Sequence, residues 1–405
     1  MFPVESEPIP DAGFSTQSVH AGEPRVKPFG SLTNPIIQTS TYTFENSAAV
    51  AEHMKRKYAG LPVLRGEYGR YTNPTQLTVE QKLAALDRCE DAMLVSSGMA
   101  AIITVFLRYL STGDHLILTA DCYRKTREFA LTFLSRFQIT VSIAPTDDLA
   151  ALERLISPQT KIIFTEMPTN PYLRVVDLPA LAEISRRHRC LLVVDSTFAT
   201  PYNLRPAEYG ADLVIHSGTK YLGGHNDLLA GSVAGPKALI QPLRETQNML
   251  GSTIDPQCAY RLLRGLKTLG LRIQRQNENG ERVARFLEGH KAIRRVFYPA
   301  LESHPDHAVA TRLMAGFGGV VSFEINGDGE CASRFIDALR IPYVGPSLGG
   351  VESIIEQPAL MSHFALDKTE REQIGIRDEL VRYALGIEDA DDLIADLDQA
   401  LRTIA

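Results

Sequence analysis

Six short apolar runs, separated by helical stretches, constrain the fold of this chain more than any other feature. They lie at residues 92–95, 115–118, 139–143, 161–164, 191–194 and 213–216. A helix beginning near Met99 and amphipathic stretches at 123–136 and 178–187 lie between them. Such strand–helix alternation predicts a mostly parallel sheet with helices on both faces. Ligands of these sheets bind where the carboxyl ends of strands meet helix N-termini, so the functional site is expected at that edge.

The regions that flank these runs predict two further units. The first 70 residues carry many turn formers and a helical stretch at 47–58, a pattern typical of a tail or of an arm wrapped on a partner. After about residue 260, a long charged helix at 260–287 precedes an alternating strand at 318–325, which favours a smaller α+β domain. We therefore expect an N-terminal arm (1–70), an α/β domain (71–277) and a C-terminal α+β domain (278–405).

Charge and cysteine usage exclude several classes of partner. The 405 residues include 42 Lys+Arg and 48 Asp+Glu, a net charge of −6, without a basic cluster, so neither nucleic acid nor an anionic membrane is an expected partner. The longest apolar stretch, near 100–107, is too short to cross a bilayer. The five cysteines are scattered without zinc-type spacing, so we expect reduced thiols and no metal site. The first residues lack secretory or transit features, which predicts a cytoplasmic location.

The strongest chemical signal is a pair of motifs that follow two of the predicted strands. Asp195 ends the run at 191–194, and Ser217-Gly218-Thr219-Lys220 follows the run at 213–216. Both motifs are therefore expected at the same edge of the sheet. Because a buried acid at a strand end is costly unless it meets a cation, Asp195 needs a positively charged partner.

The residues of these two motifs meet the requirements for binding pyridoxal 5′-phosphate (PLP). Its aldehyde condenses with a lysine amine, a carboxylate keeps its pyridine nitrogen protonated, and hydroxyl and amide groups hold its phosphate. The alternative is a salt bridge between Asp195 and Lys220 beneath a loop. The combination of all these groups at one edge favours the cofactor.

A strand-to-helix junction supplies a candidate site for the phosphate. Ser96-Ser97-Gly98-Met99-Ala100 follows the run at 92–95, and the free N–H groups at such a helix start suit an anion. Taken alone, the same pattern is also an ordinary structural turn.

Two further motifs indicate an amino-acid substrate. In the segment 121–127, Tyr123 can stack on a flat heterocycle and transfer a proton, while Lys125 and Arg127 favour an anionic substrate tail. The alternative is a helix start with exposed basic residues. Arg382, inside the apolar run 380–385, needs an anion, which is either a substrate α-carboxylate or a nearby Glu or Asp.

Together these elements resemble the Cys/Met-metabolism family of fold-type I PLP enzymes. The resemblance covers nearly the whole chain, and its further motifs lie at 33–35, 68–75, 167–171, 347–353 and 386–389. It implies a mostly parallel seven-stranded sheet between helices, a smaller C-terminal α+β domain and an N-terminal arm. It also implies PLP as cofactor, amino acids as substrates, and a homodimer with shared sites that is expected to pair into a homotetramer.

The resemblance implies a role for each candidate residue. Lys220 would hold PLP and move protons, Asp195 would pair with the ring nitrogen, and Tyr123 would stack on the ring. The remaining cofactor contacts would come from Gly98, Met99, Ser217 and Thr219 at the phosphate, from Tyr68 and Arg70 of the neighbouring subunit, and from Asn170 at the phenolic oxygen. Arg382 and Ser353 would face the substrate carboxylate and the lysine.

Within the family, segments 67–71, 121–126 and 223–227 resemble plant-type cystathionine γ-synthases most. In these, Lys125 would receive the anionic leaving group and Glu352 the distal amino group. The expected reaction is γ-replacement on an activated homoserine (O-phospho-, O-succinyl- or O-acetylhomoserine) with cysteine, giving cystathionine. The alternatives are γ-elimination to 2-oxobutanoate and ammonia, an O-acylhomoserine sulfhydrylase, and, from a different class, a PLP-carrying regulator.

Overall fold

A seven-stranded sheet lies at the centre of the computed structural model, which describes residues 12–61 and 65–404. In chain order its strands are β1 (Asp91–Val95), β2 (His115–Thr119), β3 (Thr140–Ala144), β4 (Thr160–Glu166), β5 (Leu191–Asp195), β6 (Leu213–His216) and β7 (Gly231–Gly235). The spatial order is β1-β7-β6-β5-β4-β2-β3, and β7 runs antiparallel to both of its neighbours while the other neighbouring pairs are parallel. The mostly parallel sheet predicted from the apolar runs is confirmed.

Helices cover both faces of this sheet because its strands alternate apolar side chains between the two faces. On one face lie α4 (Gly98–Tyr109) and α9 (Lys237–Leu250), where the rings of Phe106 and Phe164 meet edge to face at 5.6 Å. On the other face lie α6 (Leu149–Arg154) and α7 (Leu178–His188), whose Leu181 packs in one cluster with Leu192 of β5. A further helix, α3 (Pro74–Asp87), covers β1.

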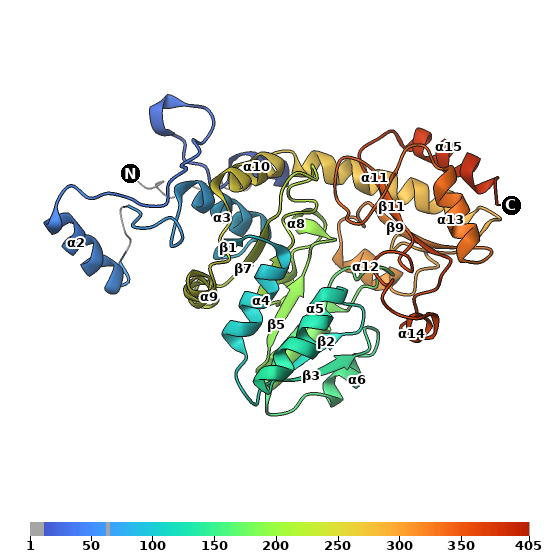
Figure 1. Cartoon of the computed structure of the whole chain (residues 1–405), viewed down its shortest axis with the longest axis horizontal. Helices are drawn as coiled ribbons and strands as arrows, with labels where there is room; N and C mark the ends of the chain where they lie inside the picture. The colour runs from blue at the N-terminus through green and yellow to red at the C-terminus, as the bar shows by residue number, and fades with distance from the viewer. Residues whose placement is uncertain (1–11, 62–64, 405) are drawn as a thin grey trace.

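A second, smaller sheet of five strands forms the C-terminal part (Figure 1). Its spatial order is β10 (Tyr343–Val344), β11 (Ile354–Glu356), β12 (Leu380–Ala384), β9 (Val320–Ile325) and β8 (Ile293–Phe297). Helices α13 (Gly329–Ala338) and α15 (Ala390–Leu401) cover it, with Phe335 packed edge to face against Phe323 at 5.9 Å. This agrees with the α+β domain that the sequence predicted.

The helix predicted at 260–287 is in fact two helices, α10 (Pro256–Leu266) and α11 (Leu269–Glu288). Thr268, between them, leaves the helical region with φ −109° and ψ 7°. The buried guanidinium of Arg272 lies at this break and donates to the Gly265 carbonyl at 2.8 Å and to the Thr268 hydroxyl at 3.2 Å.

Helix α11 connects the two sheets (Figure 1). Arg272, Gln276 and Asn279 lie on one buried face of it, because their spacing of four and three residues follows the helical turn. These side chains donate to the carbonyl oxygens of Tyr221 (2.7 Å), Gly350 (2.8 Å) and Gly386 (3.2 Å), respectively. The predicted domain boundary at 277 lies inside this helix, and the division into domains stays a prediction.

The N-terminal segment projects from the body of the molecule (Figure 1). Its helices are α1 (Phe14–His20), which lies against α3, and α2 (Ser47–Tyr58), at the position that the sequence predicts. Large apolar side chains of this segment are exposed, with Phe29 fully so. Residues 1–11 and 62–64 of the predicted arm, and with them the segment on which the location was predicted, lie outside the described residues.

Shorter elements complete the described chain. The helix predicted at 123–136 consists of α5 (Arg124–Glu128), a π-helical turn (Phe129–Phe133) and a 3₁₀ turn (Leu134–Phe137). The remaining elements are α8 (Thr200–Asn203), α12 (His307–Leu313), α14 (Lys368–Gln373) and the 3₁₀ turns Pro28–Gly30 and Pro206–Tyr209. Across residues 12–61 and 65–404, no helix has the length and apolarity that spanning a membrane requires.

Candidate active site

Asp195 ends β5 at the carboxyl edge of the large sheet. Its Oδ1 accepts hydrogen bonds from the backbone N–H of Thr197 at 3.0 Å and from the Thr197 hydroxyl at 2.5 Å. That hydroxyl oxygen accepts in turn from the backbone N–H of Ser217 at 2.8 Å, which joins the ends of β5 and β6. Removal from water raises the pKa of the Asp195 carboxyl, and the bonds from Thr197 oppose the shift.

A second carboxyl group, Glu166, lies beside Asp195. The two residues are paired in register at the ends of β4 and β5. Glu166 Oε1 accepts the backbone N–H of Tyr123 at 2.5 Å, so it fixes the start of α5. Burial, with the neighbouring charge of Asp195, raises the pKa of Glu166 well above its usual value.

The N-terminus of α4 forms the anion-binding end of the site. The Ser97 hydroxyl accepts from the N–H of Ala100 at 3.1 Å and caps the helix, and the N–H groups of Gly98 and Met99 lack helical partners by their position in the first turn. A Cβ at Gly98 would lie 2.8 Å from the Cβ of Ser217, so these two predicted residues are in direct contact. The Thr219 hydroxyl hydrogen-bonds the backbone of Ala230 at 3.0 and 3.2 Å.

Lys220 extends from the same segment toward the small domain. Its Nζ donates to the Ser347 hydroxyl at 2.7 Å. Burial and the nearby charge of Arg382 lower the pKa of Lys220 to about 8, while Glu356 opposes the shift. A substantial fraction of this amine is therefore neutral near physiological pH, as a nucleophile or proton acceptor must be.

Arg382 lies on β12 with its guanidinium among three polar partners. Nη1 donates to Asn170 Oδ1 at 3.1 Å, and Nη2 donates to the Ser347 carbonyl at 2.9 Å and lies 3.0 Å from Glu356 Oε1. Glu356 is thus one partner of Arg382. A nearby acid of the protein was one of the two kinds of anion that the sequence analysis allowed for Arg382. Its Nε is buried and has no hydrogen-bond partner among the described residues, so one donor of this guanidinium is unsatisfied.

A cavity of about 540 Å³ opens beside these groups, lined among others by Thr219, Ser347 and Glu352. Glu352 Oε2 accepts from Asn226 Nδ2 at 2.8 Å, which holds its carboxylate at the rim. The cavity therefore has the negative charge of Glu352 at its opening. Ser347, the hydrogen-bond partner of Lys220, forms part of its wall.

Several predicted residues lie elsewhere or have other partners. Ser353 is buried, and its hydroxyl donates to Glu388 at 2.9 Å, so the hydroxyl that Lys220 contacts is that of Ser347. Lys125 pairs with Glu128 at 2.8 Å on the surface of α5. Tyr123 is 45% exposed at the start of that helix.

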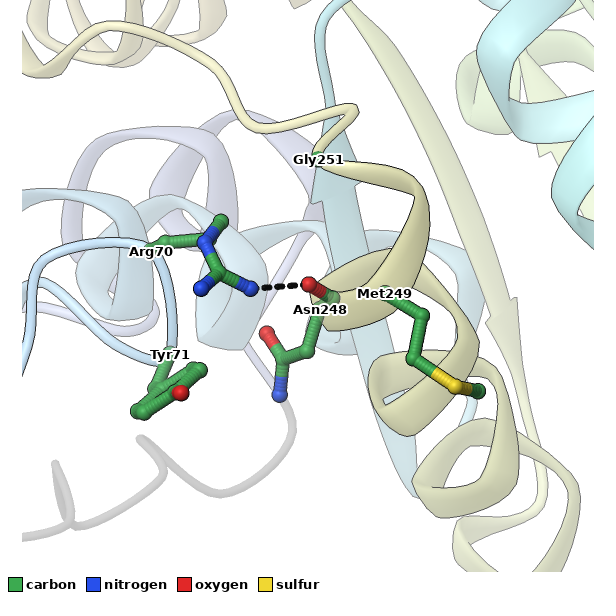
Figure 2. A pocket seen from close by; sticks show the side chains of 5 residues that line it. All are labelled: Arg70, Tyr71, Asn248, Met249 and Gly251. Atoms are coloured by element: carbon green, nitrogen blue, oxygen red, sulfur yellow. Dashed lines mark hydrogen bonds between the residues drawn. The ribbon is translucent and has the colours of Figure 1, made fainter.

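Tyr68 and Arg70 lie at the C-terminal end of α9. Figure 2 shows the guanidinium of Arg70 directed at the carbonyl oxygen of Asn248, to which it donates a hydrogen bond. The same guanidinium lies over the ring of Tyr68, 5.4 Å from its centre. A cavity of about 360 Å³, lined by Arg70, Tyr71, Asn248, Met249 and Gly251, opens at this place.

Sequence reasoning missed three polar groups of the site: Glu166, Ser347 and Glu356. Two of them carry a usable signal, because Glu166 and Glu356 are acids at the ends of apolar runs, as Asp195 is. Ser347 lies in a segment that the family motif contains, but its contact with Lys220 depends on how the loop folds.

The donor set fits PLP. Asp195 would receive the pyridinium N–H, the helix start at Gly98 with Ser217 would take the phosphate, and Lys220 would bond the aldehyde carbon. A Cβ at position 98 would lie too close to Ser217, and glycine keeps this helix start free of a side chain that would obstruct an anion. Fold and site together define a PLP-dependent enzyme of fold type I.

Comparison with known proteins identifies the family. Residues 15–402 match the model of the Cys/Met metabolism PLP-dependent enzyme family, and the chain belongs to that family. It is 44% identical over 390 residues to cystathionine gamma-synthase 1 of Nicotiana tabacum, a chloroplastic protein (96% of this chain, 71% of the relative), and 39% identical to cystathionine gamma-lyase of Bacillus subtilis (96% and 99%). The solved structure of cystathionine gamma-lyase from Lactobacillus plantarum complexed with L-serine matches with a TM-score of 0.89 at 37% identity, covering 97% of this chain and 99% of that one. PLP is therefore the cofactor of this enzyme.

Proposed function

We propose that this enzyme replaces the γ-substituent of an activated homoserine with the thiol of cysteine, giving cystathionine. The activated forms considered are the O-phospho, O-succinyl and O-acetyl esters. The degree of similarity supports this reaction, since two relatives named cystathionine gamma-synthase share 44% identity and the relatives named as lyases share 38–39%.

The observation that carries the proposal is the carboxylate of Glu352 at the rim of the 540 Å³ cavity. Asn226 holds one of its oxygens at 2.8 Å and leaves the other for a ligand. An incoming cysteine carries an ammonium group close to its thiol, and a fixed carboxylate at the opening suits that group. Water or sulfide has no such group to bind.

Named residues of the chain would carry out the individual steps. Arg382 would bind the substrate's α-carboxylate with its guanidinium, and Lys220, as a neutral amine, would take the proton from Cα and deliver it within the site. When bound, PLP supplies an electron sink that makes the protons at Cα and Cβ acidic. Tyr123 would stack on the ring and accept the thiol proton. Lys125, which pairs with Glu128 in this structure, would meet the departing anion.

The test is to incubate the holoenzyme with each homoserine ester, with and without cysteine, and to measure cystathionine by mass spectrometry and 2-oxobutanoate by a coupled assay. We expect cystathionine with at least one ester and suppression of 2-oxobutanoate by cysteine. Rapid release of 2-oxobutanoate that cysteine leaves unchanged would contradict the proposal.

The second candidate is γ-elimination, which gives 2-oxobutanoate and ammonia from the same substrate class. Its support is the similarity to the gamma-lyases of Bacillus subtilis and Lactobacillus plantarum. The same incubation separates the two reactions, and replacing cysteine by sulfide tests the third candidate, a sulfhydrylase.

A homodimer with shared sites, paired into a tetramer, belongs to the same proposal. It is supported by the projecting N-terminal segment with its exposed apolar side chains, among them Val26, Phe29 and Leu32 at 85–100% exposure. Monomeric proteins rarely expose a group of large apolar side chains, so we expect a second copy of the chain to pack against these residues. The cytoplasmic location stays a prediction.

A further inference from the structure

A buried histidine and a buried acid form a pair at the carboxyl end of β6. His216 is the last residue of β6, and its Nε2 lies 3.0 Å from Oδ1 of Asp87, the last residue of α3. The two side chains are 1% and 0% exposed. Such a pair is an expensive way to fill a core, because apolar residues of similar volume are often at least as stable there.

The hydrogen bonding of this pair is incomplete. Asp87 Oδ2 and His216 Nδ1 are buried and have no hydrogen-bond partner among the described residues. A buried polar atom without a partner costs free energy, and its presence in a folded protein calls for an explanation. Packing alone therefore does not account for the pair.

His216 lies close to Asp195 across neighbouring strands. β5 and β6 are parallel, and Asp195 is in register with Ile215, the residue before His216. The residue after His216 is linked to the same carboxylate, because the Ser217 N–H donates to the Thr197 hydroxyl, which donates to Asp195. The position of His216 relative to Asp195 is therefore fixed on both sides by the ends of the two strands.

The charges of His216 and Asp195 act on each other. Burial raises the pKa of the Asp195 carboxyl, while the hydrogen bonds from Thr197 and the charge of His216 oppose this shift. Burial disfavours a charge on His216, but the carboxylates of Asp87 and Asp195 outweigh it and raise the pKa of His216. The charge of Arg205 also acts on Asp87. The interaction between His216 and Asp195 thus favours an imidazolium at one and a carboxylate at the other.

Asp195 needs this support because a second acid lies beside it. Glu166 is paired in register with Asp195, and two neighbouring acids favour protonation of one of them. A carboxyl group that is to hold a proton on a pyridine nitrogen must itself stay ionised. We propose that His216, held by Asp87, is a positioning residue that keeps Asp195 ionised and thereby keeps the ring nitrogen of PLP protonated. This role requires PLP as the cofactor and is independent of which γ-reaction the enzyme catalyses.

The experiment replaces the charged pair by neutral groups in the holoenzyme. Asp87→Asn keeps the shape of the side chain and removes its charge. The double variant Asp87→Asn/His216→Gln substitutes two amides, which can hydrogen-bond each other, for the two charges. The control is His115→Gln, because His115 is also buried on the large sheet but contacts the hydroxyl groups of Thr160 (2.8 Å) and Ser142 (2.9 Å).

Protonation of the ring nitrogen is measured by solid-state NMR of holoenzyme that contains PLP labelled with ¹⁵N at this atom, since its chemical shift differs between the protonated and unprotonated forms. The same proteins give the dissociation constant of PLP, the rate of α-proton exchange of L-alanine in deuterated water, and the thermal unfolding midpoint. L-alanine has no γ-substituent, so these results do not depend on whether the enzyme forms cystathionine.

We expect the ¹⁵N signal of both variants to move toward the unprotonated position. The dissociation constant of PLP should rise about tenfold. Exchange should slow about 10- to 100-fold, the range for the loss of an outer partner of a metal ligand. His115→Gln should keep the wild-type signal and exchange rate.

A ring nitrogen that stays fully protonated in either variant would overturn the proposal. The isosteric Asp87→Asn keeps this test available should the double variant fail to fold. An equal change of signal and exchange rate in His115→Gln would show that lower stability alone is the cause, and would overturn the proposal as well.

Discussion

Glu356 and Arg382 form a buried ion pair across two neighbouring strands of the small sheet. Glu356 Oε1 lies 3.0 Å from Arg382 Nη2, and the side chains are 2% and 6% exposed. The two residues are in register on β11 and β12. The residue expected to bind a substrate carboxylate therefore already has a carboxylate on one side, so the substrate adds a second anion to a single guanidinium.

Replacing Glu356 by Gln should destabilise the protein. The guanidinium of Arg382 would then be buried without its counter-charge, and breaking a buried pair costs about 3–5 kcal/mol in free energy of unfolding. Urea denaturation of the holoenzyme measures the loss. The double variant Glu356→Gln/Arg382→Met should recover part of it. A single variant as stable as the wild type would contradict this account of the pair.

The amine of Lys220 should titrate near pH 8 in protein freed of cofactor. Burial and Arg382 lower its pKa to about 8, so its neutral form grows as the pH rises through 8. Acetylation by limiting acetic anhydride, followed for the Lys220 peptide by mass spectrometry from about pH 6 to 11, gives this pKa. Because Glu356 raises the pKa of Lys220, the Glu356→Gln variant should titrate lower still. A midpoint near the ordinary lysine value of 10.5 would show that the site does not desolvate the amine.

Glu352→Gln should weaken the use of cysteine and leave the use of sulfide unchanged. The variant keeps a hydrogen-bonding group but removes the charge that would pair with the ammonium of cysteine, so the KM for cysteine should rise about tenfold, equivalent to about 1.4 kcal/mol. Asn226→Ala, which only releases the Glu352 carboxylate, should have a smaller effect in the same direction. Equal changes with both nucleophiles would assign Glu352 another role.

Subunits that carry Arg70→Ala and Lys220→Ala should complement each other when co-expressed. Each variant alone should be inactive, because every site then lacks either Lys220 or Arg70. If each site takes Lys220 from one subunit and Arg70 from the other, random pairing should restore about a quarter of the wild-type activity, because about half of the dimers contain one intact site of two. Steady-state activity of the purified mixture is the measurement, and the absence of recovery would argue for a site within one chain.

Lys82→Met should release α1 from the body of the protein. Lys82 is fully buried on α3, where its Nζ donates to the carbonyl oxygens of Ser18 (2.8 Å) and Val19 (3.0 Å). Loss of these charged hydrogen bonds should lower the free energy of unfolding by about 2–4 kcal/mol. Limited proteolysis should then cleave near α1 faster than in the wild type. Lys82 also pairs with Glu23 at 3.4 Å, and the more exposed Lys267 pairs with the same carboxylate at 2.8 Å. Lys267→Met is therefore the control and should have a smaller effect.

The large sheet was predictable because buried parallel strands are continuous apolar runs. β7 was missed, since its sequence begins and ends with glycine. The reason is crowding by other backbone segments: a Cβ at Gly231 would lie 2.0 Å from the Ser97 carbonyl oxygen, and one at Gly235 would lie 2.7 Å from that of Asp212. In a strand whose glycines allow other backbone segments to lie close to it, apolar side chains do not alternate, so the sequence pattern does not predict the strand.

The charged residues of the site were predictable for a similar reason. Asp195 ends an apolar run and Arg382 interrupts one, and a charge in such a place needs a partner or a function. Lys220 was predicted because its segment, Ser217 to Lys220, follows the next apolar run. The partners themselves come from distant parts of the chain. Asn170 follows a strand of the large sheet, and Glu356 lies on the strand of the small sheet next to that of Arg382. A neutral residue such as Ser347 gives no local sign of its contact with Lys220.

Helix α11 sets the distance between the two walls of the cavity. Arg272 fixes the carbonyl beside Lys220, and Gln276, one turn further on, fixes the loop that carries Ser347. The distance between these two hydrogen-bonded positions is set by the pitch of a single helix and not by the packing between the two sheets. Inserting one residue between Arg272 and Gln276 would turn the second attachment by about 100° and pull the walls out of alignment, although every residue of the site would still be present.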